Sequence, residues 1–223
     1  LIGAIYSDVS GNASGQAYVV LGATLATSAV LSLSDSDWVM PGEAALDRLG
    51  RTICSPGDAD GDGLDDIFVG ASLNDEAGTD AGKVYLQLAA SLPSSGTIDP
   101  AATDYSFVGT TAGTWAGGDV SGADYDGDGL GDMLVGSYGV DDGATNAGQA
   151  YIILAANLGG AGTYSLSAAD YAFTGVSGGE EVGYDLAPAG DVNGDGLLDL
   201  LVGAWLADDL YSNAGKAYLF LSP

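Results

Sequence analysis

A repeat of 66 or 67 residues runs through the chain and constrains its fold more than any other feature. Glycines that end short apolar runs recur at this interval, at Gly3, Gly70, Gly136 and Gly203. Tyrosines inside a second set of apolar runs keep the same interval, at Tyr18, Tyr85, Tyr151 and Tyr218. Self-similarity at a fixed period is typical of repeat architectures, so we predict copies of one supersecondary unit.

Each complete unit contains four candidate strands. One apolar run precedes an aspartate-rich loop and one follows it; the tyrosine run comes next, and the fourth begins at an Asp-aromatic pair such as Asp104-Tyr105. Short apolar runs that end at glycine are typical of strands. Four strands joined by short turns are typical of a β-propeller blade. We therefore predict an all-β fold, a single partial β-propeller over 1–223 with blades at about 1–44, 45–111, 112–177 and 178–223.

The first and last units are incomplete in the sequence. The first begins at the strand that follows the loop position, and the last ends after its tyrosine strand. Open sheet edges favour aggregation. We therefore expect these blades to be part of a larger ring, either as a piece of a longer chain or as a subunit that joins another copy.

Three units carry a loop with side-chain oxygens at positions 1, 3, 5 and 9 and a glycine at position 6. Such a loop suits a hard cation, above all Ca²⁺, and a backbone carbonyl at position 7 completes the pattern. The sequence therefore predicts three Ca²⁺ sites. The predicted ligands are Asp58, Asp60, Asp62, Leu64 and Asp66; Asp124, Asp126, Asp128, Leu130 and Asp132; and Asp191, Asn193, Asp195, Leu197 and Asp199.

Two other interpretations of the loops are weaker. A helix-loop-helix calcium site needs a bidentate Glu at position 12 and flanking helices, but valine stands there and a strand-like run follows each loop. Metal-free surface turns would have to tolerate the repulsion among crowded carboxylates three times over.

Composition excludes several classes of function. The chain has 31 acidic and 4 basic residues, a formal net charge of -27, so it lacks the basic surface that binding nucleic acid or an anionic membrane requires. It has no histidine and a single cysteine, Cys54, which is predicted to be a small packing residue. Little remains for nucleophilic or general-base chemistry, and we expect no enzyme.

These motifs resemble the FG-GAP repeat of integrin α-subunit propellers and their bacterial relatives, over essentially the whole chain. A DxDxDGxxD loop precedes a VGA-type strand, with an LG-like pair upstream and a G-[QK]-x-Y segment downstream. The Phe-Gly pair of that family is replaced by Leu49-Gly50, Ala116-Gly117 and Val182-Gly183. The resemblance implies a seven-bladed propeller in which a calcium loop joins the innermost strand of each blade to the next.

The expected function is that of a secreted, cell-surface propeller segment in adhesion or protein/matrix interaction, with structural Ca²⁺. Its partner would be a protein or glycan, or further blades of the same chain or another copy, without membrane insertion. A structural subunit of a surface layer or appendage is one alternative, and a carbohydrate-binding or polysaccharide-lyase propeller is another. Three tryptophans could stack on sugar rings, but packing between sheets is the favoured interpretation for them: Trp38, Trp115 and Trp205. Four acidic connections could line one face of the molecule, but their favoured interpretation is as solvated turns. They span 8–15, 75–82, 141–148 and 208–215.

Overall fold

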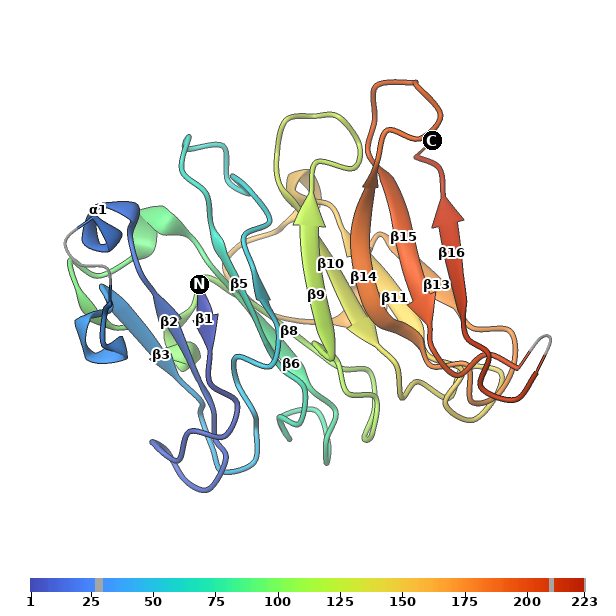
Figure 1. Cartoon of the computed structure of the whole chain (residues 1–223), viewed down its shortest axis with the longest axis horizontal. Coiled ribbons are helices and arrows are strands. Elements are labelled where there is room, and N and C mark those ends of the chain that lie inside the picture. Colours follow the sequence, from blue (N-terminus) through green and yellow to red (C-terminus); the bar gives the residue numbers. More distant parts are fainter. Residues whose placement is uncertain (27–29, 209–210, 223) are drawn as a thin grey trace.

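The computed structural model describes residues 1–26, 30–208 and 211–222, which form four β-sheets (Figure 1). The first sheet has the order β1-β2-β3-β7 and contains β1 (Ile2–Gly3), β2 (Gln16–Val19), β3 (Trp38–Pro41) and β7 (Gly96–Thr97). The second has the order β12-β8-β6-β5-β4 and contains β4 (Ile53–Cys54), β5 (Ile67–Ala71), β6 (Lys83–Gln87), β8 (Tyr105–Val108) and β12 (Gly162–Ser165).

The third sheet has the order β13-β11-β10-β9 and contains β9 (Asp119–Ala123), β10 (Asp132–Ser137), β11 (Gln149–Ile153) and β13 (Tyr171–Thr174). The fourth has the order β14-β15-β16 and contains β14 (Val182–Gly190), β15 (Asp199–Ala204) and β16 (Lys216–Phe220). Helical segments are short: α1 (Gly22–Leu25) and the 3₁₀ turns Leu33–Asp35, Ala89–Ser91, Pro100–Ala102, Ala155–Asn157 and Leu166–Ala168. The all-β class predicted from the sequence is therefore confirmed, and four sheets of three to five strands are consistent with propeller blades.

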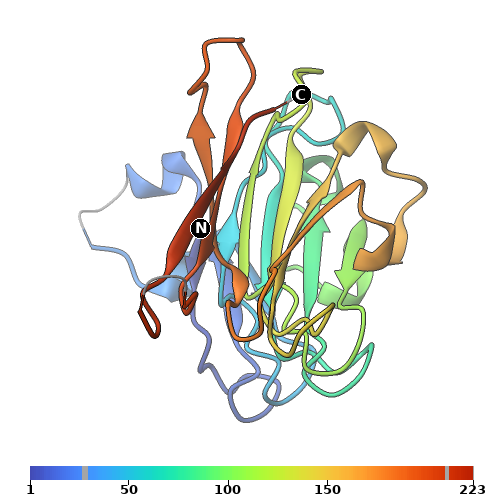
Figure 2. The same cartoon turned by 90° about the vertical axis from the view of Figure 1, so that its right-hand side faces the viewer.

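The sheets stand side by side in chain order and the described residues form no closed ring (Figures 1 and 2). Successive residues of a strand point to opposite faces of its sheet. In β5, Val69 packs towards the first sheet and Phe68 towards the third. The same alternation in β10 directs Met133 to the second sheet and Leu134 to the fourth. Strands of the inner sheets are buried on both faces, which explains their nearly continuous apolar runs.

Glycines bring neighbouring sheets into backbone contact. A Cβ added to Gly136 would lie 2.0 Å from the carbonyl oxygen of Gly183, and one added to Gly70 would lie 2.5 Å from that of Gly117. Close by, parallel bridges join Gly15 to Leu49, Gly82 to Ala116 and Gly148 to Val182. The repeated glycines are thus sites of close approach between sheets, where a side chain would not fit.

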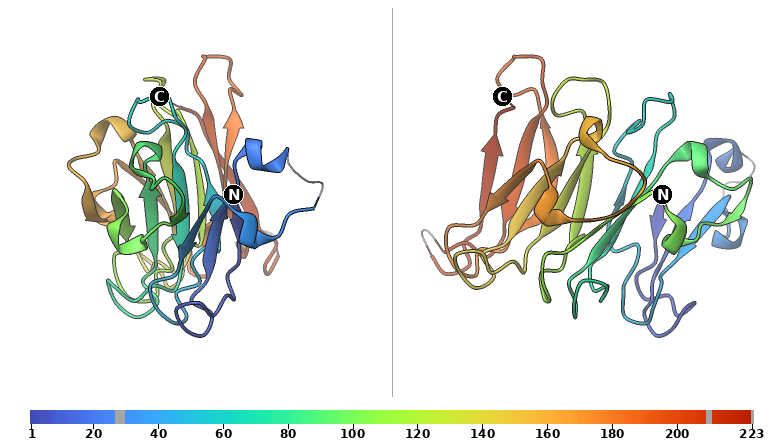
Figure 3. Two further views of the ribbon diagram at one scale, coloured as in Figure 1. Left: turned by 90° about the vertical axis from the view of Figure 1, so that its left-hand side faces the viewer. Right: turned by 180° about the vertical axis from the view of Figure 1, so that it is seen from behind.

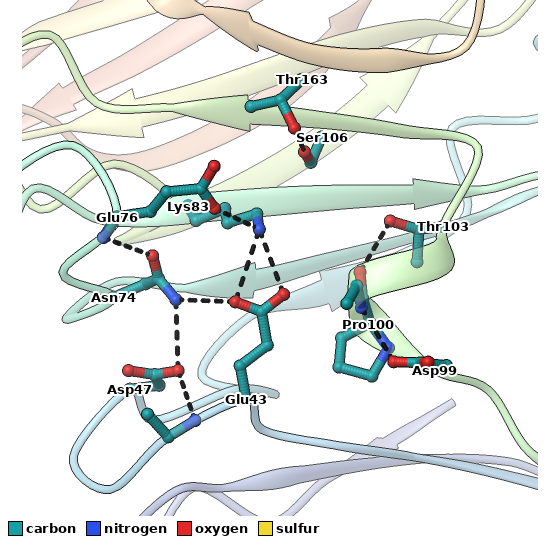
Figure 4. Close-up of polar contacts among 12 residues, drawn as sticks. Glu43, Asp47, Asn74, Glu76, Lys83, Asp99, Pro100, Thr103, Ser106 and Thr163 are labelled. Atoms are coloured by element: carbon teal, nitrogen blue, oxygen red, sulfur yellow. Dashed lines mark hydrogen bonds and ion pairs between the residues drawn. The ribbon is translucent and has the colours of Figure 1, made fainter.

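Two strands, β7 and β12, were absent from the strands predicted from the sequence. Each leaves its own repeat and pairs in parallel with the outer strand of the preceding sheet, β7 with β3 and β12 with β8. Figure 3 shows the segments that carry them on the outer side of the molecule. A hydroxyl contact of 2.9 Å between Ser106 and Thr163 accompanies the second pairing (Figure 4). Both strands are short and mostly exposed, so they lack the apolar alternation by which strands are recognised.

Among the described residues, no helix has the length and apolar character needed to cross a membrane.

Candidate metal centres

The three aspartate-rich loops lie at one end of the sheets, where they join β4 to β5, β9 to β10 and β14 to β15 (Figure 1). In the first loop the Asp58 carboxylate accepts backbone N–H bonds from Gly61 (2.7 Å), Asp62 (3.1 Å) and Gly63 (2.8 Å). These donors, Gly63 foremost, lower the pKa of Asp58. Gly63 has a φ of 89°, a left-handed conformation that glycine adopts without strain.

The other two loops repeat this conformation. Asp124 accepts from Gly127 (2.7 Å) and Gly129 (3.0 Å), as Asp191 does from Gly194 (2.6 Å) and Gly196 (2.9 Å). At position 5, the carboxylates of Asp62, Asp128 and Asp195 each accept the backbone N–H two residues later, at 2.8, 2.8 and 2.9 Å. The same sequence pattern thus folds in the same way three times.

The donor set of these loops fits a hard cation. Carboxylate oxygens of Asp58, Asp60 and Asp66 lie within 4.8 Å of one another, and so do those of Asp124, Asp126 and Asp128. In the third loop Asn193 replaces an aspartate and donates a hydrogen bond of 2.6 Å to Asp195. Anionic and carbonyl oxygens brought together in this way are the ligands that Ca²⁺ takes in proteins. The individual ligand assignments at all predicted positions, including the carbonyls of Leu64, Leu130 and Leu197, stay predictions.

The aspartate at position 9 has a structural role that spacing alone did not reveal. Asp66 accepts the backbone N–H of Ala59 within the loop and that of Ala89 after the tyrosine strand, both at 2.8 Å. Asp132 binds Tyr125 (2.8 Å) and Ala155 (2.9 Å) in the same way. Asp199 repeats the arrangement with Val192 and Ser222. Burial raises the pKa of Asp66, and it raises that of Asp132 to about 6.

Adjacent loops touch one another. The backbone N–H of Gly131 in the second loop donates to the carbonyl of Asp58 in the first, at 2.8 Å. Leu130 packs against Gly61, and Leu197 of the third loop packs against Gly127 of the second. The three loops therefore form a continuous row along one end of the molecule.

At the opposite end lie the acidic connections, whose aspartates stabilise the turns themselves. Asp8, Asp75 and Asp141 each accept the backbone N–H five residues later, at 2.7, 2.8 and 2.7 Å. Residues 209–210 of the fourth connection lie outside the described residues. The first aspartate of each of these three turns therefore stabilises its own turn through this hydrogen bond.

Lys83 belongs to a partly buried polar network between the first two sheets that sequence reasoning missed (Figure 4). Its ammonium group lies 3.1 Å from Glu43 and 2.6 Å from Glu76. Asn74 donates to Asp47 (3.1 Å), whose pKa burial raises. One of the four basic residues is therefore bound to carboxylates inside the protein, which leaves still less cationic surface.

Comparison with known protein families agrees with this geometry. The FG-GAP repeat family matches residues 50–86 and 182–220, which include the first and third loops. The resemblance is thereby confirmed over these two segments, each of which is an FG-GAP repeat. Together with the sheets, these repeats indicate a β-propeller-type interaction domain. No curated protein matches the chain.

Proposed function

We propose that this chain is an extracellular β-propeller segment that acts in cell-surface adhesion or matrix interaction and is stabilised by Ca²⁺. The observation that carries the proposal is the threefold recurrence of one loop conformation, together with the carboxylate oxygens that cluster in the first two loops. Calcium bound there would neutralise carboxylates at positions 1, 3 and 5. Extracellular calcium modules bind at levels of about 10⁻⁴–10⁻³ M, which matches exposed loops of this kind.

Binding rather than catalysis is the role that the side chains favour. The sequence contains no histidine, and burial raises the pKa of the Cys54 thiol to about 12, so the thiol stays protonated near neutral pH. Cys54 packs against the core between the second and third sheets, as a packing residue does. We further propose that more blades of the same type complete a ring of seven, the number that the family resemblance implies.

Calcium dependence is the decisive test. We expect the melting temperature to fall markedly when about 1 mM Ca²⁺ is replaced by excess EGTA, because a ligand that binds only the folded state stabilises it. Calorimetric titration should show three sites per chain, and Asp126→Asn should weaken one of them.

Asp65→Asn is the matched control, because Asp65 lies in the first loop at a position without a predicted ligand role. It should leave all three sites unchanged. A melting temperature that does not respond to EGTA would contradict the proposal.

A further inference from the structure

An apolar cavity of about 230 Å³ lies between the third and fourth sheets, beside the outer strand β13. Its walls include Tyr171 and Phe173 of β13, Ile152 of β11 and Phe220 of β16. The rings of Phe173 and Phe220 lie 4.2 Å apart, measured between their centroids. The cavity is smaller than the roughly 300–1,000 Å³ of small-ligand sites, so its size favours a few side chains of a polypeptide as its occupant.

The equivalent place between the second and third sheets is filled by the protein itself. There the wall positions are held by Leu86, Tyr105, Phe107 and Ile153, which belong to one apolar cluster. The ring of Tyr164 lies in that cluster, 6.4 Å from the ring of Tyr105 and 6.0 Å from that of Phe107. Further residues of the segment that carries β12 join it: Leu158, Leu166 and Ala169. Side chains of the third repeat thus occupy the space that is a cavity one repeat later.

The segment that carries β7 does the same between the first and second sheets. Leu92 and Ile98 pack in the apolar cluster there, and they stand in the repeat where Leu158 and Tyr164 do. In both segments the leucine is followed by three residues and then by Gly-Thr. One recurring segment therefore fills the outer side of two successive sheet pairs.

Burial of this segment depends on whether a preceding sheet is present. A 3₁₀ turn follows the Gly-Thr pair, and its first residue, Pro100 or Leu166, is buried. Leu33 begins the corresponding turn of the first repeat, for which the described residues provide no preceding sheet, and it is 40% exposed. The apolar positions of the segment are therefore suited to contact with the sheet of the preceding repeat.

An aromatic residue at the start of each outer strand holds the segment by a hydrogen bond. Trp38 donates its indole N–H to the carbonyl of Pro93 (2.7 Å), and Tyr105 donates its hydroxyl to the carbonyl of Gly159 (3.2 Å). Both acceptors stand three residues before the Gly-Thr pair. Tyr171 holds the same position in β13, lines the cavity and is 48% exposed. It is therefore placed to hold a third segment of this kind.

The outer edge of β13 can accept a parallel strand. Among the described residues β13 pairs with β11 alone, whereas β3 and β8 also pair with β7 and β12. Gly96 and Gly162 begin those pairings by donating their N–H groups to the carbonyls of Asp37 (3.0 Å) and Asp104 (2.9 Å). Asp170 stands at the same position before β13. An open strand edge beside a pocket for alternate side chains is a site at which a sheet adds a strand.

We propose that the edge of β13 and the cavity beside it bind the equivalent Gly-Thr segment of a further repeat, as a parallel strand. Its apolar residue after the Gly-Thr pair would lie against Tyr171 and Phe173. Because β8 and β13 share the pattern Tyr-x-Phe, a segment that fits β8 also suits β13. Residues 92–98 and 158–164 carry no charge, which avoids repulsion in a chain of net charge -27. The inference rests on the further blades proposed above and names the part of them that this edge binds.

The test supplies the segment by extending the chain. Residue 223 stands in the repeat where residue 156 does, so a copy of residues 157–168 is added after it at the natural spacing. We expect the melting temperature in Ca²⁺ to rise by about 4 °C or more, because the added apolar side chains become buried. Amide hydrogen exchange in residues 171–174 should slow at the same time. The matched control is the same extension with serine in place of its copies of Tyr164 and Leu166, and it should change the melting temperature by less than about 1 °C.

Tyr171→Phe removes only the hydroxyl that would hold the added segment. The extension should therefore raise the melting temperature of this variant less than that of wild type. Equal effects of the two extensions, or unchanged hydrogen exchange in residues 171–174, would overturn the inference. Sedimentation of the unextended chain tests the other occupant, since dimers that the extension dissociates would assign the edge to a second copy and overturn the choice of a further repeat.

Melting curves of the unextended chain in Ca²⁺ and in EGTA separate this inference from the metal sites. Calcium-dependent melting without a gain from the extension removes the strand site alone. A gain from the extension without calcium dependence removes the metal sites alone.

Discussion

At the scale of single residues, the same side chain takes different roles according to its surroundings. Asp58 is surrounded by backbone N–H donors, which favour its charged form, whereas Asp132 and Asp119 are desolvated, which favours the neutral form. The position-9 aspartates also tie each metal loop to the chain segment after the tyrosine strand. The 31 acidic residues of the chain therefore do not share one role.

The carboxyl group of Asp119 should make stability depend on pH. Burial raises its pKa from 3.8 to about 6. Between these values the folded state binds more protons than the unfolded state, so this group's contribution to stability falls as pH rises. The unfolding free energy of Asp119→Asn, relative to that of wild type, should therefore increase from pH 4 to 6 and level off above about pH 7. Urea denaturation at each pH in EGTA measures it, and a pH-independent difference would refute the prediction.

Removal of the Lys83 ammonium group should destabilise the fold. Lys83→Met leaves Glu43 and Glu76 without their cation, and Glu43 is only partly exposed. We expect a loss of about 1–3 kcal/mol, less than for a fully buried pair because Glu76 is solvated. Urea denaturation measures this loss, and adding Glu43→Gln to the variant should recover part of it. Equal stability of Lys83→Met and wild type would show that the network contributes nothing.

At the scale of elements, the sheets are joined by backbone contacts at glycines as well as by apolar side chains. Glycines of β1, β5 and β10 lie against a glycine carbonyl at the start of the next repeat, at Gly3, Gly70 and Gly136. The outer strands β3 and β8 gain parallel partners from the following repeat, which covers edges that would otherwise be open. The first repeat is thus connected to the second, and the second to the third, at both the inner and the outer side.

The glycine contact between the third and fourth sheets can be tested directly. Gly136→Ala places a methyl group 2.0 Å from the Gly183 carbonyl oxygen, so the sheets must move apart. We expect a loss of about 2–3 kcal/mol or more in unfolding free energy, as for other overpacked sites. Gly160→Ala is the control, because its added Cβ meets no atom within 4 Å. Similar urea midpoints for the two variants would contradict the close contact.

At the scale of the whole molecule, the net charge of -27 opposes compaction. Calcium in the loops would relieve part of this repulsion locally, and dissolved salt would relieve it generally. The two effects should therefore overlap, since charge already neutralised by bound calcium no longer responds to screening.

Salt should consequently stabilise the calcium-free protein more than the calcium-loaded protein. Raising NaCl from about 10 mM to about 150 mM shortens the Debye length from about 30 Å to about 8 Å. We expect the melting temperature in EGTA to rise more than that in Ca²⁺, as followed by circular dichroism. Choline chloride should act like NaCl if screening is the cause. Equal shifts in both states would count against the loops as centres of repulsion.

Local patterns in the sequence predicted much of this protein. The glycine and tyrosine periods indicated the four sheets, and the Asp-Gly spacing indicated three turns of one conformation, because these features depend on residues close together in the chain. β7 and β12 escaped prediction because their parallel pairing relies on backbone groups, with little apolar pattern to mark it.

What the sequence by itself determined is the repeat, its strands and the loops that gather oxygens around a point. Tertiary structure decided which residues of different repeats meet. Asp119 of β9 accepts the backbone N–H of Leu186 in β14, 67 residues later, only because the third and fourth sheets pack side by side. Lys83 reaches Glu43 only across two sheets. The physical reason is that turns and strands follow from local conformational preferences, whereas these contacts depend on how whole sheets pack against one another.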